Sequence, residues 1–387
     1  MINNFISIFK DRYSQYRIRS RAVKTFFSII GAIQELRIKK LIRSNLDLIN
    51  IKTLPNVVNV GIFCPGHLGD FVLTLAAYDE VLNKKYPKNY KCTLILGSWN
   101  KEISECLSKV KKLNYIFLDH PLSNRKNNFF LKYILLFLDF KKRVSFLRGQ
   151  AFHMVIFPYT YRPTLAKESF YANIPIRVGY VSSCNEEFLN FPMRLEIGSE
   201  KSIGNEFLSQ FFLISYAYKL LNKKTKTDAK IIFDDYKCKN FKFQIHQNHE
   251  NRYWVIHSTA SVPTKDLSLE TIVDIHRAAL LLNRKLVFTG QRLRGDISSI
   301  LEYRNSIDMI GATNMESLIG VIEKSELIIS ADTLAAHISA YYNKPQIILK
   351  QYFQNDFVPI YGNILYGSKD EIFLDLINIY KNSGYEL

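Results

Sequence analysis

Residues 327–349 read LIISADTLAAHISAYYNKPQIIL. Residues 327–330 form a short apolar run, residues 333–342 carry apolar side chains at helical spacing, and residues 346–349 are apolar again. A strand, a helix and a second strand joined in this way are typical of a parallel sheet covered by helices. The stretch therefore predicts an α/β fold, with a polar loop where the first strand passes into the helix.

The same alternation recurs on both sides of a polar stretch at residues 222–252, which is the best candidate for a linker. Before the linker, a helix is expected at residues 71–84 and strands at residues 57–63, 93–96, 115–118 and 154–157. After it, helices are expected at residues 268–282 and 315–323 and strands at residues 253–256 and 285–289.

A chain of 387 residues is too long for one ordinary hydrophobic core, so we expect more than one domain. We predict a basic amphipathic helical arm over residues 1–52, a Rossmann-like domain over residues 53–235 and a second one over residues 236–387. The two domains would face each other across a cleft, and the last helix could pack back on the first domain.

Composition excludes several classes of protein. The sequence is 47% hydrophobic and 22% charged, as in globular proteins, and no uninterrupted apolar run is long enough to span a membrane. The N-terminus lacks the features of a signal peptide. The five cysteines have neither metal-ligand nor redox spacing, so we expect reduced thiols in a cytoplasmic protein, without disulfides or structural zinc.

The net charge of +17 is unevenly distributed along the chain. Residues 1–50 hold ten lysines and arginines against three acids, and residues 121–150 hold seven against one. Interleaved with large apolar residues, these charges suit amphipathic helices on an anionic membrane surface. The cations expected to face membrane or acceptor are Lys132, Lys141, Lys142 and Arg143. Helices packed on the core are the alternative; nucleic-acid binding fits less well, because no recognition motif is present.

Three predicted strand ends carry glycine or polar residues, and α/β sheets bind ligands at this edge. The first is the loop PGHLGD at residues 65–70. Gly66 and Gly69 let the backbone approach a ligand closely. Asp70 opens the following helix, where it either caps the helix N-terminus or faces the cleft.

The second strand end reads HSTASVPTK at residues 257–265. Its hydroxyl groups, among them Ser261 and Thr264, precede Lys265, a combination that suits a phosphate or another oxyanion. A polar surface loop is the alternative interpretation.

The third strand end lies within the opening stretch. Unpaired amides at a helix N-terminus, with Thr333 in the first turn, make an anion site. His337 follows Thr333 by four residues and so shares its helix face. A core histidine bonded to a carbonyl is the alternative for His337.

Taken together, these segments resemble glycosyltransferase family 9, the bacterial lipopolysaccharide heptosyltransferases. The matching motifs are HLGDFVLTLAAYDEVLNKKYP at residues 67–87, SVPTKDLSLETIVDI at residues 261–275 and the whole of residues 311–349, with a shorter match, IRVGY, at residues 176–180. The resemblance covers about residues 57–349. It implies a GT-B fold of two Rossmann-like domains, and a metal-independent reaction that inverts the anomeric carbon and needs no cofactor.

The resemblance also implies roles for individual residues. Asp70 matches the proposed general base, which takes the proton from the acceptor hydroxyl. Lys265 and Thr333 match residues that contact the donor phosphates, and Ser261 and Thr264 belong to the same motif as Lys265.

The donor sugar and its nucleobase have matching positions as well. Asp332 matches the acid that binds donor-sugar hydroxyls, and His337, the last residue of that motif, is assigned with it. Thr313 and Met315 fall where the family lines its adenine pocket.

Two features depart from the family pattern. Leu334 stands where the family usually has glycine, and residues 350–356 read KQYFQND in place of a small Gly-Pro-Thr loop. A side chain at Leu334 would crowd a donor held against the helix start. The departures indicate a changed donor, and less readily a loss of activity.

The leading hypothesis is an inverting glycosyltransferase bound peripherally to the inner face of the cytoplasmic membrane. It would move a sugar, by default heptose from ADP-heptose, onto a lipid-linked saccharide. One alternative keeps the fold but uses another nucleotide sugar, with O-antigen, capsule or a protein as acceptor. A second is a non-catalytic scaffold docked to the membrane. A nucleotide-sugar epimerase fits less well, because the matched motifs are not those of that family.

Overall fold

The structure is a computed structural model that describes residues 54–64, 66–83, 90–110, 114–121, 135, 138–158, 163–180, 188–193, 206–223, 253–259, 266–291, 305–349, 359, 363–367 and 371–383. The expected basic arm at residues 1–52, most of the polar linker and the predicted domain boundary at residues 235–236 lie outside this set. Among the described helices, none is both long and apolar enough to cross a membrane.

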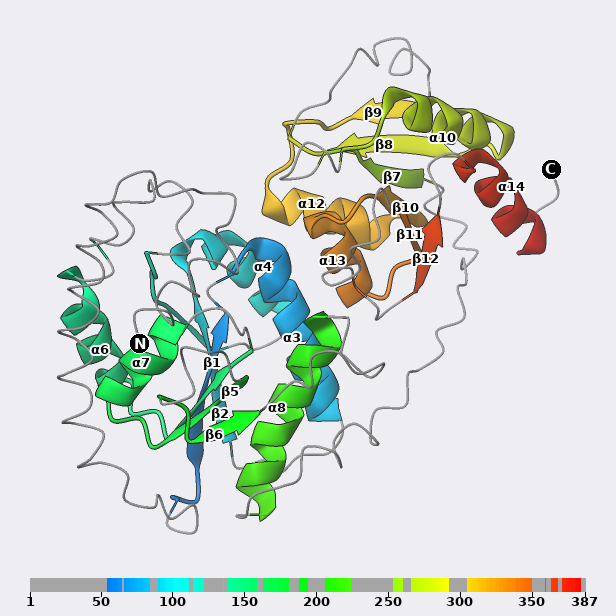
Figure 1. Ribbon diagram of the computed structural model, residues 1–387. Helices are drawn as coiled ribbons and strands as arrows, with labels where there is room; N and C mark the ends of the chain where they lie inside the picture. The colour runs from blue at the N-terminus through cyan, green and yellow to red at the C-terminus, as the bar shows by residue number, and fades with distance from the viewer. Residues whose placement is uncertain are drawn as a thin grey trace, which may run out of the picture.

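The first domain is built on a parallel sheet of six strands in the order β3-β2-β1-β4-β5-β6 (Figure 1). The strands are β1 (Val58–Cys64), β2 (Tyr90–Leu96), β3 (Tyr115–Phe117), β4 (Met154–Phe157), β5 (Ile176–Tyr180) and β6 (Phe191–Met193). Apolar runs make β1 and β4 almost wholly buried, as expected for central parallel strands.

Helices cover both faces of this sheet. The helices are α3 (Leu68–Asn83), α4 (Lys101–Val110), α6 (Phe140–Gly149), α7 (Pro163–Tyr171) and α8 (Glu206–Lys223), and a short 3₁₀ helix, η2 (Ser98–Asn100), precedes α4. Side chains of α3, α4 and α8 share one buried cluster, and those of α6 and α7 share another on the opposite face. The first domain is therefore a three-layer α/β/α unit.

The second domain repeats this plan, with the strand order β12-β11-β10-β7-β8-β9. Its strands are β7 (Tyr253–His257), β8 (Lys285–Thr289), β9 (Ser306–Asp308), β10 (Leu327–Ser330), β11 (Gln346–Leu349) and β12 (Ile364–Gly367). Its helices are α10 (Leu269–Leu281), α12 (Met315–Lys324), α13 (Leu334–Tyr341) and α14 (Ile372–Asn382). The predicted α/β fold and each strand and helix predicted from periodicity are confirmed, with ends shifted by a few residues.

The last helix, α14, packs on α10 of its own domain (Figure 1). The indole nitrogen of Trp254 donates to the hydroxyl of Tyr380 at 2.6 Å, so α14 is fixed to the buried strand β7. The guanidinium of Arg284 lies 5.1 Å from the Tyr380 ring centroid.

Replacing Tyr380 by phenylalanine is expected to destabilise the second domain, because the buried indole N–H of Trp254 loses its acceptor. The cost should be about 1–3 kcal/mol. Each kcal/mol should lower the Tm of a domain of this size by about 2–4 °C, which calorimetry measures. Tyr366→Phe is the matched control, since that hydroxyl bonds a carbonyl from a side chain that is 39% exposed. Equal shifts in the two variants would contradict this role for Tyr380.

The two domains meet along helices. α3 contacts α13, and α4 contacts α12. The hydroxyl of Tyr341 donates to Asp79 Oδ2 at 3.0 Å, and the amide of Met315 donates to Glu102 Oε1 at 2.8 Å. Each bond joins one domain to the other, and buried apolar side chains of α3 and α13 belong to one cluster.

Candidate active site

The glycine loop between β1 and α3 holds Asp70 through a backbone hydrogen bond and through the space that Gly66 leaves for its side chain. Asp70 lies in the first turn of α3, and its Oδ2 accepts from the amide of His67 at 2.7 Å. A side chain at Gly66 could not coexist with this arrangement, because its Cβ would lie 2.3 Å from Asp70 Oδ2. Asp70 therefore receives a backbone donor at the helix start, as a capping residue does, while its side chain stays half-exposed.

The loop between β10 and α13 places the second group of polar residues. Thr333 is the N-cap residue of α13 and has extended backbone angles. Among the described residues, the hydroxyl of Thr333 has no hydrogen-bond partner, although the residue is only 8% exposed. An N-cap hydroxyl normally accepts from an amide of its own helix. Here the hydroxyl and the first amides of α13 are not paired with each other, as suits an anion site.

His337 connects this group to the glycine loop. Its Nε2 lies 3.8 Å from Asp332 Oδ1, and the residue is buried. A Cβ added at Gly69 would lie 2.9 Å from the His337 ring carbon Cδ2, so the ring lies directly against α3. The contact joins the turn that carries Asp70 to the helix that carries Thr333. His337 is therefore an interdomain residue, which the sequence did not predict.

Polar residues that sequence reasoning missed lie beside this site. Ser330 and His257 are opposite each other at the carboxyl ends of β10 and β7. Burial lowers the pKa of His257 to about 4, so the imidazole is neutral near neutral pH, and its Nδ1 lies 3.0 Å from Thr289 Oγ1. The strand-end position of HST at residues 257–259 was the available signal.

Two further buried hydroxyls are unpaired at this edge within the described part of the chain, those of Ser258 and Ser330. Buried hydroxyls usually have partners, so a group of unpaired ones indicates a place for water or for a polar ligand. With Thr333, they line the carboxyl edge of the second sheet where β7 and β10 end.

The remaining predicted donor residues divide into two sets. Thr313 and Met315 lie at the start of α12, half-buried, and the amide of Met315 is bonded to Glu102. Leu334, the first residue of α13, is half-buried and packs against the core. The phosphate residues predicted from the second motif lie outside the described residues: Ser261, Thr264 and Lys265.

The predicted membrane-facing cations are placed only in part. Lys141 and Lys142 are exposed on α6, and Lys132 lies outside the described residues. Arg143 was predicted wrongly. It is 4% exposed, and its Nε donates to Glu168 Oε1 at 2.8 Å, because its position on α6 faces α7 and not solvent.

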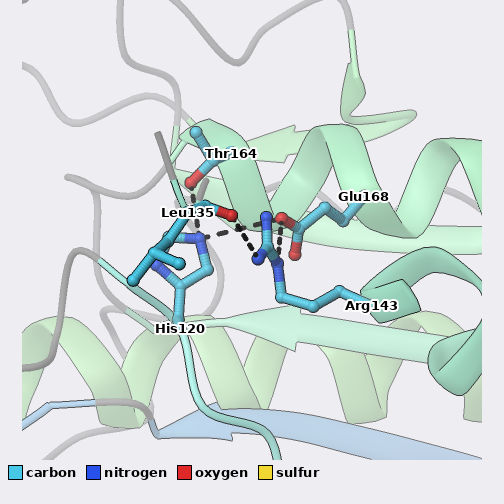
Figure 2. Close-up of polar contacts among 5 residues, drawn as sticks. All are labelled: His120, Leu135, Arg143, Thr164 and Glu168. Atoms are coloured by element: carbon cyan, nitrogen blue, oxygen red, sulfur yellow. Dashed lines mark hydrogen bonds and ion pairs between the residues drawn. The ribbon is translucent and has the colours of Figure 1, made fainter. Parts of the chain in front are cut away.

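Figure 2 shows the buried cluster around Arg143. His120 Nε2 lies 3.0 Å from Thr164 Oγ1 and 3.8 Å from Glu168 Oε1, and both His120 and Glu168 are fully buried. Burial raises the pKa of Glu168 to about 7, against the opposing effect of Arg143. The cluster joins the segment after β3 to α6 and α7, so it holds the first domain together.

Other described residues give no second site. In the described part of the chain, Cys64, Cys92 and Cys106 form no disulfide with one another. In the described ranges, no three His, Cys, Asp or Glu side chains gather closely enough to hold a metal ion. A cavity of about 440 Å³ lies at the amino ends of β1, β2 and β3, at the sheet edge away from Asp70.

Comparisons with known proteins agree on the fold. The chain is similar to Escherichia coli ADP-heptose lipopolysaccharide heptosyltransferase II, with a TM-score of 0.60 and 13% identity over 85% of this chain and 100% of that one. A glycosyl transferase family 9 protein from Veillonella parvula matches with a TM-score of 0.57 and 14% identity, over 86% of this chain and 91% of that one. The E. coli heptosyltransferase WaaC, solved with ADP, matches with a TM-score of 0.56 and 12% identity, over 85% and 100% of the two chains.

Sequence comparison finds less. No protein-family profile matches the chain, and no curated protein matches it. The structural likenesses establish that the chain has the GT-B fold of family 9 heptosyltransferases, with two Rossmann-like domains. The fold that the motifs implied is therefore confirmed.

Proposed function

We propose that this protein is a glycosyltransferase that moves a sugar from a nucleotide-diphosphate donor to a hydroxyl of a lipid-linked saccharide. Heptose from ADP-heptose is the donor we expect first. The observation that carries the proposal is the contact of His337 with Gly69. It brings a carboxylate on one domain to the same junction as a helix N-terminus and buried hydroxyls on the other.

In the proposed reaction, the acceptor hydroxyl attacks the anomeric carbon and gives its proton to the carboxylate of Asp70. The bond from the anomeric carbon to the phosphate oxygen breaks, and the nucleoside diphosphate leaves with that electron pair. The new bond forms on the face opposite the leaving group, so the configuration inverts. General-base help of this kind is worth about 10² to 10⁴ in rate.

The second domain would hold the departing diphosphate. The first amides of α13 and the hydroxyl of Thr333 are donors already fixed by the fold, and fixed donors stabilise developing charge without reorganising. Lys265 is proposed to add a cation with Ser261 and Thr264, so the reaction would need no metal. Asp332 and His337 are proposed to bind sugar hydroxyls, and Thr313 and Met315 the nucleobase.

A panel of donors tests this proposal by isothermal calorimetry, with ADP-heptose compared against UDP-, GDP- and CMP-sugars. We expect ADP-heptose to bind most tightly and Thr333→Val to weaken that binding by about tenfold, the worth of about one hydrogen bond to a charged group. Ser339→Ala is the control, because that hydroxyl bonds Ala335 O within α13. If another nucleotide sugar binds most tightly, that sugar replaces ADP-heptose as the proposed donor. If no donor binds, the proposal that the protein is a glycosyltransferase is contradicted.

A different donor is the second candidate, supported by Leu334. Its half-buried side chain stands at the first position of α13, where a donor diphosphate would approach. Leu334→Gly is expected to improve ADP-heptose binding if the side chain excludes that donor. The same calorimetric panel measures the change.

We also propose that the protein binds peripherally to the cytoplasmic face of the membrane, near its acceptor. The support is the pair of exposed lysines on α6, Lys141 and Lys142, within a segment rich in basic and apolar residues. Each lysine near an anionic surface contributes about 1 kcal/mol.

Reversing both charges, Lys141→Glu with Lys142→Glu, is expected to weaken binding to phosphatidylglycerol vesicles by tenfold or more, on the order of 1 kcal/mol per lysine. Removing residues 1–50 should weaken it further, and added salt should weaken wild-type binding. Lys285→Glu with Lys324→Glu is the matched control, since both lysines are exposed on the second domain. Vesicle co-sedimentation measures the binding of each variant. Binding that does not depend on salt, or an equal loss of binding in the control variant, would contradict the membrane role.

A further inference from the structure

The peptide group between Gly66 and His67 is held at both of its ends. Its N–H, on His67, donates to Asp70 Oδ2 at 2.7 Å. Its carbonyl, on Gly66, accepts from the indole nitrogen of Trp99 at 2.7 Å and from the amide nitrogen of Asn100 at 3.3 Å. Because a peptide unit is planar and rigid, fixing the carbonyl also fixes the direction of the N–H.

Trp99 is itself held in place by the segment between β2 and α4. A Cβ at Gly97 would lie 2.2 Å from the indole carbon Cζ2, so only glycine leaves room for this ring position. The amide of Ser98 donates to Asp119 Oδ1 at 2.7 Å, which fixes the turn to the segment after β3. The segment between β2 and α4 therefore holds the indole against Gly66. Gly97 leaves room for the ring, and Gly66 supplies the carbonyl that accepts from it.

Asn100 supports the same carbonyl from a wholly buried position. Two residues later, Glu102 accepts from the first amide of α12 in the second domain. The segment at residues 97–102, which spans η2 and the start of α4, therefore contacts both the glycine loop and the opposite domain.

We propose that Trp99 and Asn100 are positioning residues for Asp70, acting through the Gly66–His67 peptide group. Their two N–H groups hold the carbonyl, the carbonyl orients the His67 N–H, and that N–H holds the carboxylate. Donors on the carbonyl also polarise the peptide, which strengthens its N–H as a donor. This positioning role rests on the proposed function of Asp70 as the base. The hydrogen bonds that link Trp99 and Asn100 to Asp70 do not depend on that function.

Losing the indole donor frees the Gly66–His67 peptide group to rotate. The His67 N–H then holds the Asp70 carboxylate for only part of the time, so the carboxylate is misplaced. Displacements of about 1 Å cost up to about 10² in rate.

The test compares Trp99→Phe with wild type by two readouts. The first is hydrogen exchange of the His67 amide, followed by NMR in the full chain without ligand. In Trp99→Phe we expect the His67 amide to exchange about tenfold faster or more, because losing a bond worth about 1.4 kcal/mol makes local opening more frequent. The amides of β1 should exchange at unchanged rates. Unchanged exchange at His67 would overturn the proposal.

The second readout is the rate of ADP release from ADP-heptose as a function of donor concentration. We expect kcat to fall about tenfold to a hundredfold. KM should stay within about twofold, because Trp99 does not lie on the donor-binding domain. Faster exchange at His67 with an unchanged kcat would show a merely structural role and overturn the proposal.

Two companion variants keep the result interpretable. Gly97→Ala displaces the indole while keeping Trp99, and it should give the same pattern if Trp99→Phe folds poorly. Tyr90→Phe is the matched control, because it removes a hydroxyl bond to Asn222 at the other end of β2 and should leave both readouts unchanged. If wild type releases no ADP, or if Asp70→Asn matches wild type, the proposed function fails, and the exchange of His67 still decides whether Trp99 holds the loop.

Discussion

Asp70→Asn is expected to lower the rate of sugar transfer by about 10² to 10⁴ while leaving donor affinity nearly unchanged. Asparagine keeps the size of the side chain and an oxygen that can accept from the His67 amide, which now meets Asp70 Oδ2 at 2.7 Å. The fold of the loop should therefore persist, and only the ability to take up the acceptor proton is removed. Single-turnover kinetics separate this chemical step from donor binding.

The matched control is the other carboxylate at the junction. Asp332→Asn should raise the donor dissociation constant, because that residue is proposed to bind sugar hydroxyls and lies 3.8 Å from His337. Calorimetry with the donor measures this change. A transfer rate for Asp70→Asn within a few-fold of wild type would remove Asp70 from the role of base.

Arg143→Met is expected to destabilise the protein by about 3–5 kcal/mol, the usual cost of removing one partner of a buried ion pair. The reason is Glu168, whose carboxyl group would stay in a buried site without the guanidinium that now lies 2.8 Å away. Methionine approximates the length of the arginine stem, so lost packing contributes little. Urea unfolding followed by circular dichroism measures the change.

The destabilisation should depend on pH. Burial raises the pKa of Glu168 from 4.5 to about 7 in the folded protein. The folded state thus holds a proton that the unfolded state releases, and this contribution to stability falls as pH rises through that window. Without Arg143 the pKa should rise further, so the loss should be larger at about pH 8.5 than at about pH 5.5, where Glu168 is protonated.

A double variant distinguishes an unpaired charge from lost volume. Arg143→Met combined with Glu168→Met should recover much of the stability, because replacing both members of a buried pair by apolar side chains is often neutral or favourable. No recovery, or a single-variant loss independent of pH, would show that the pair is not responsible.

Sequence periodicity predicted the central strands of both sheets, except β5, because their burial pattern is strong. β10 and β11 are buried along their whole length, and the helix between them carries apolar residues at regular spacing. Of the edge strands, β3 was predicted, and β6, β9 and β12 were not. All four are three or four residues long and only partly buried, so their sequences carry little pattern. They form because a neighbouring strand offers backbone hydrogen bonds, which no local pattern records.

The sequence by itself determined the alternation of strands and helices and the polar residues at three strand ends, because both follow from local periodicity and turn chemistry. Asp70 and Thr333 could be chosen on that basis, and Asp332 followed from the family resemblance. Only the tertiary structure decided that His337 packs on Gly69, that Arg143 turns inward to Glu168, and that Trp99 reaches Gly66. These pairings depend on how helices and loops far apart in sequence pack in three dimensions. The local sequence around a side chain does not reveal which distant residue it contacts.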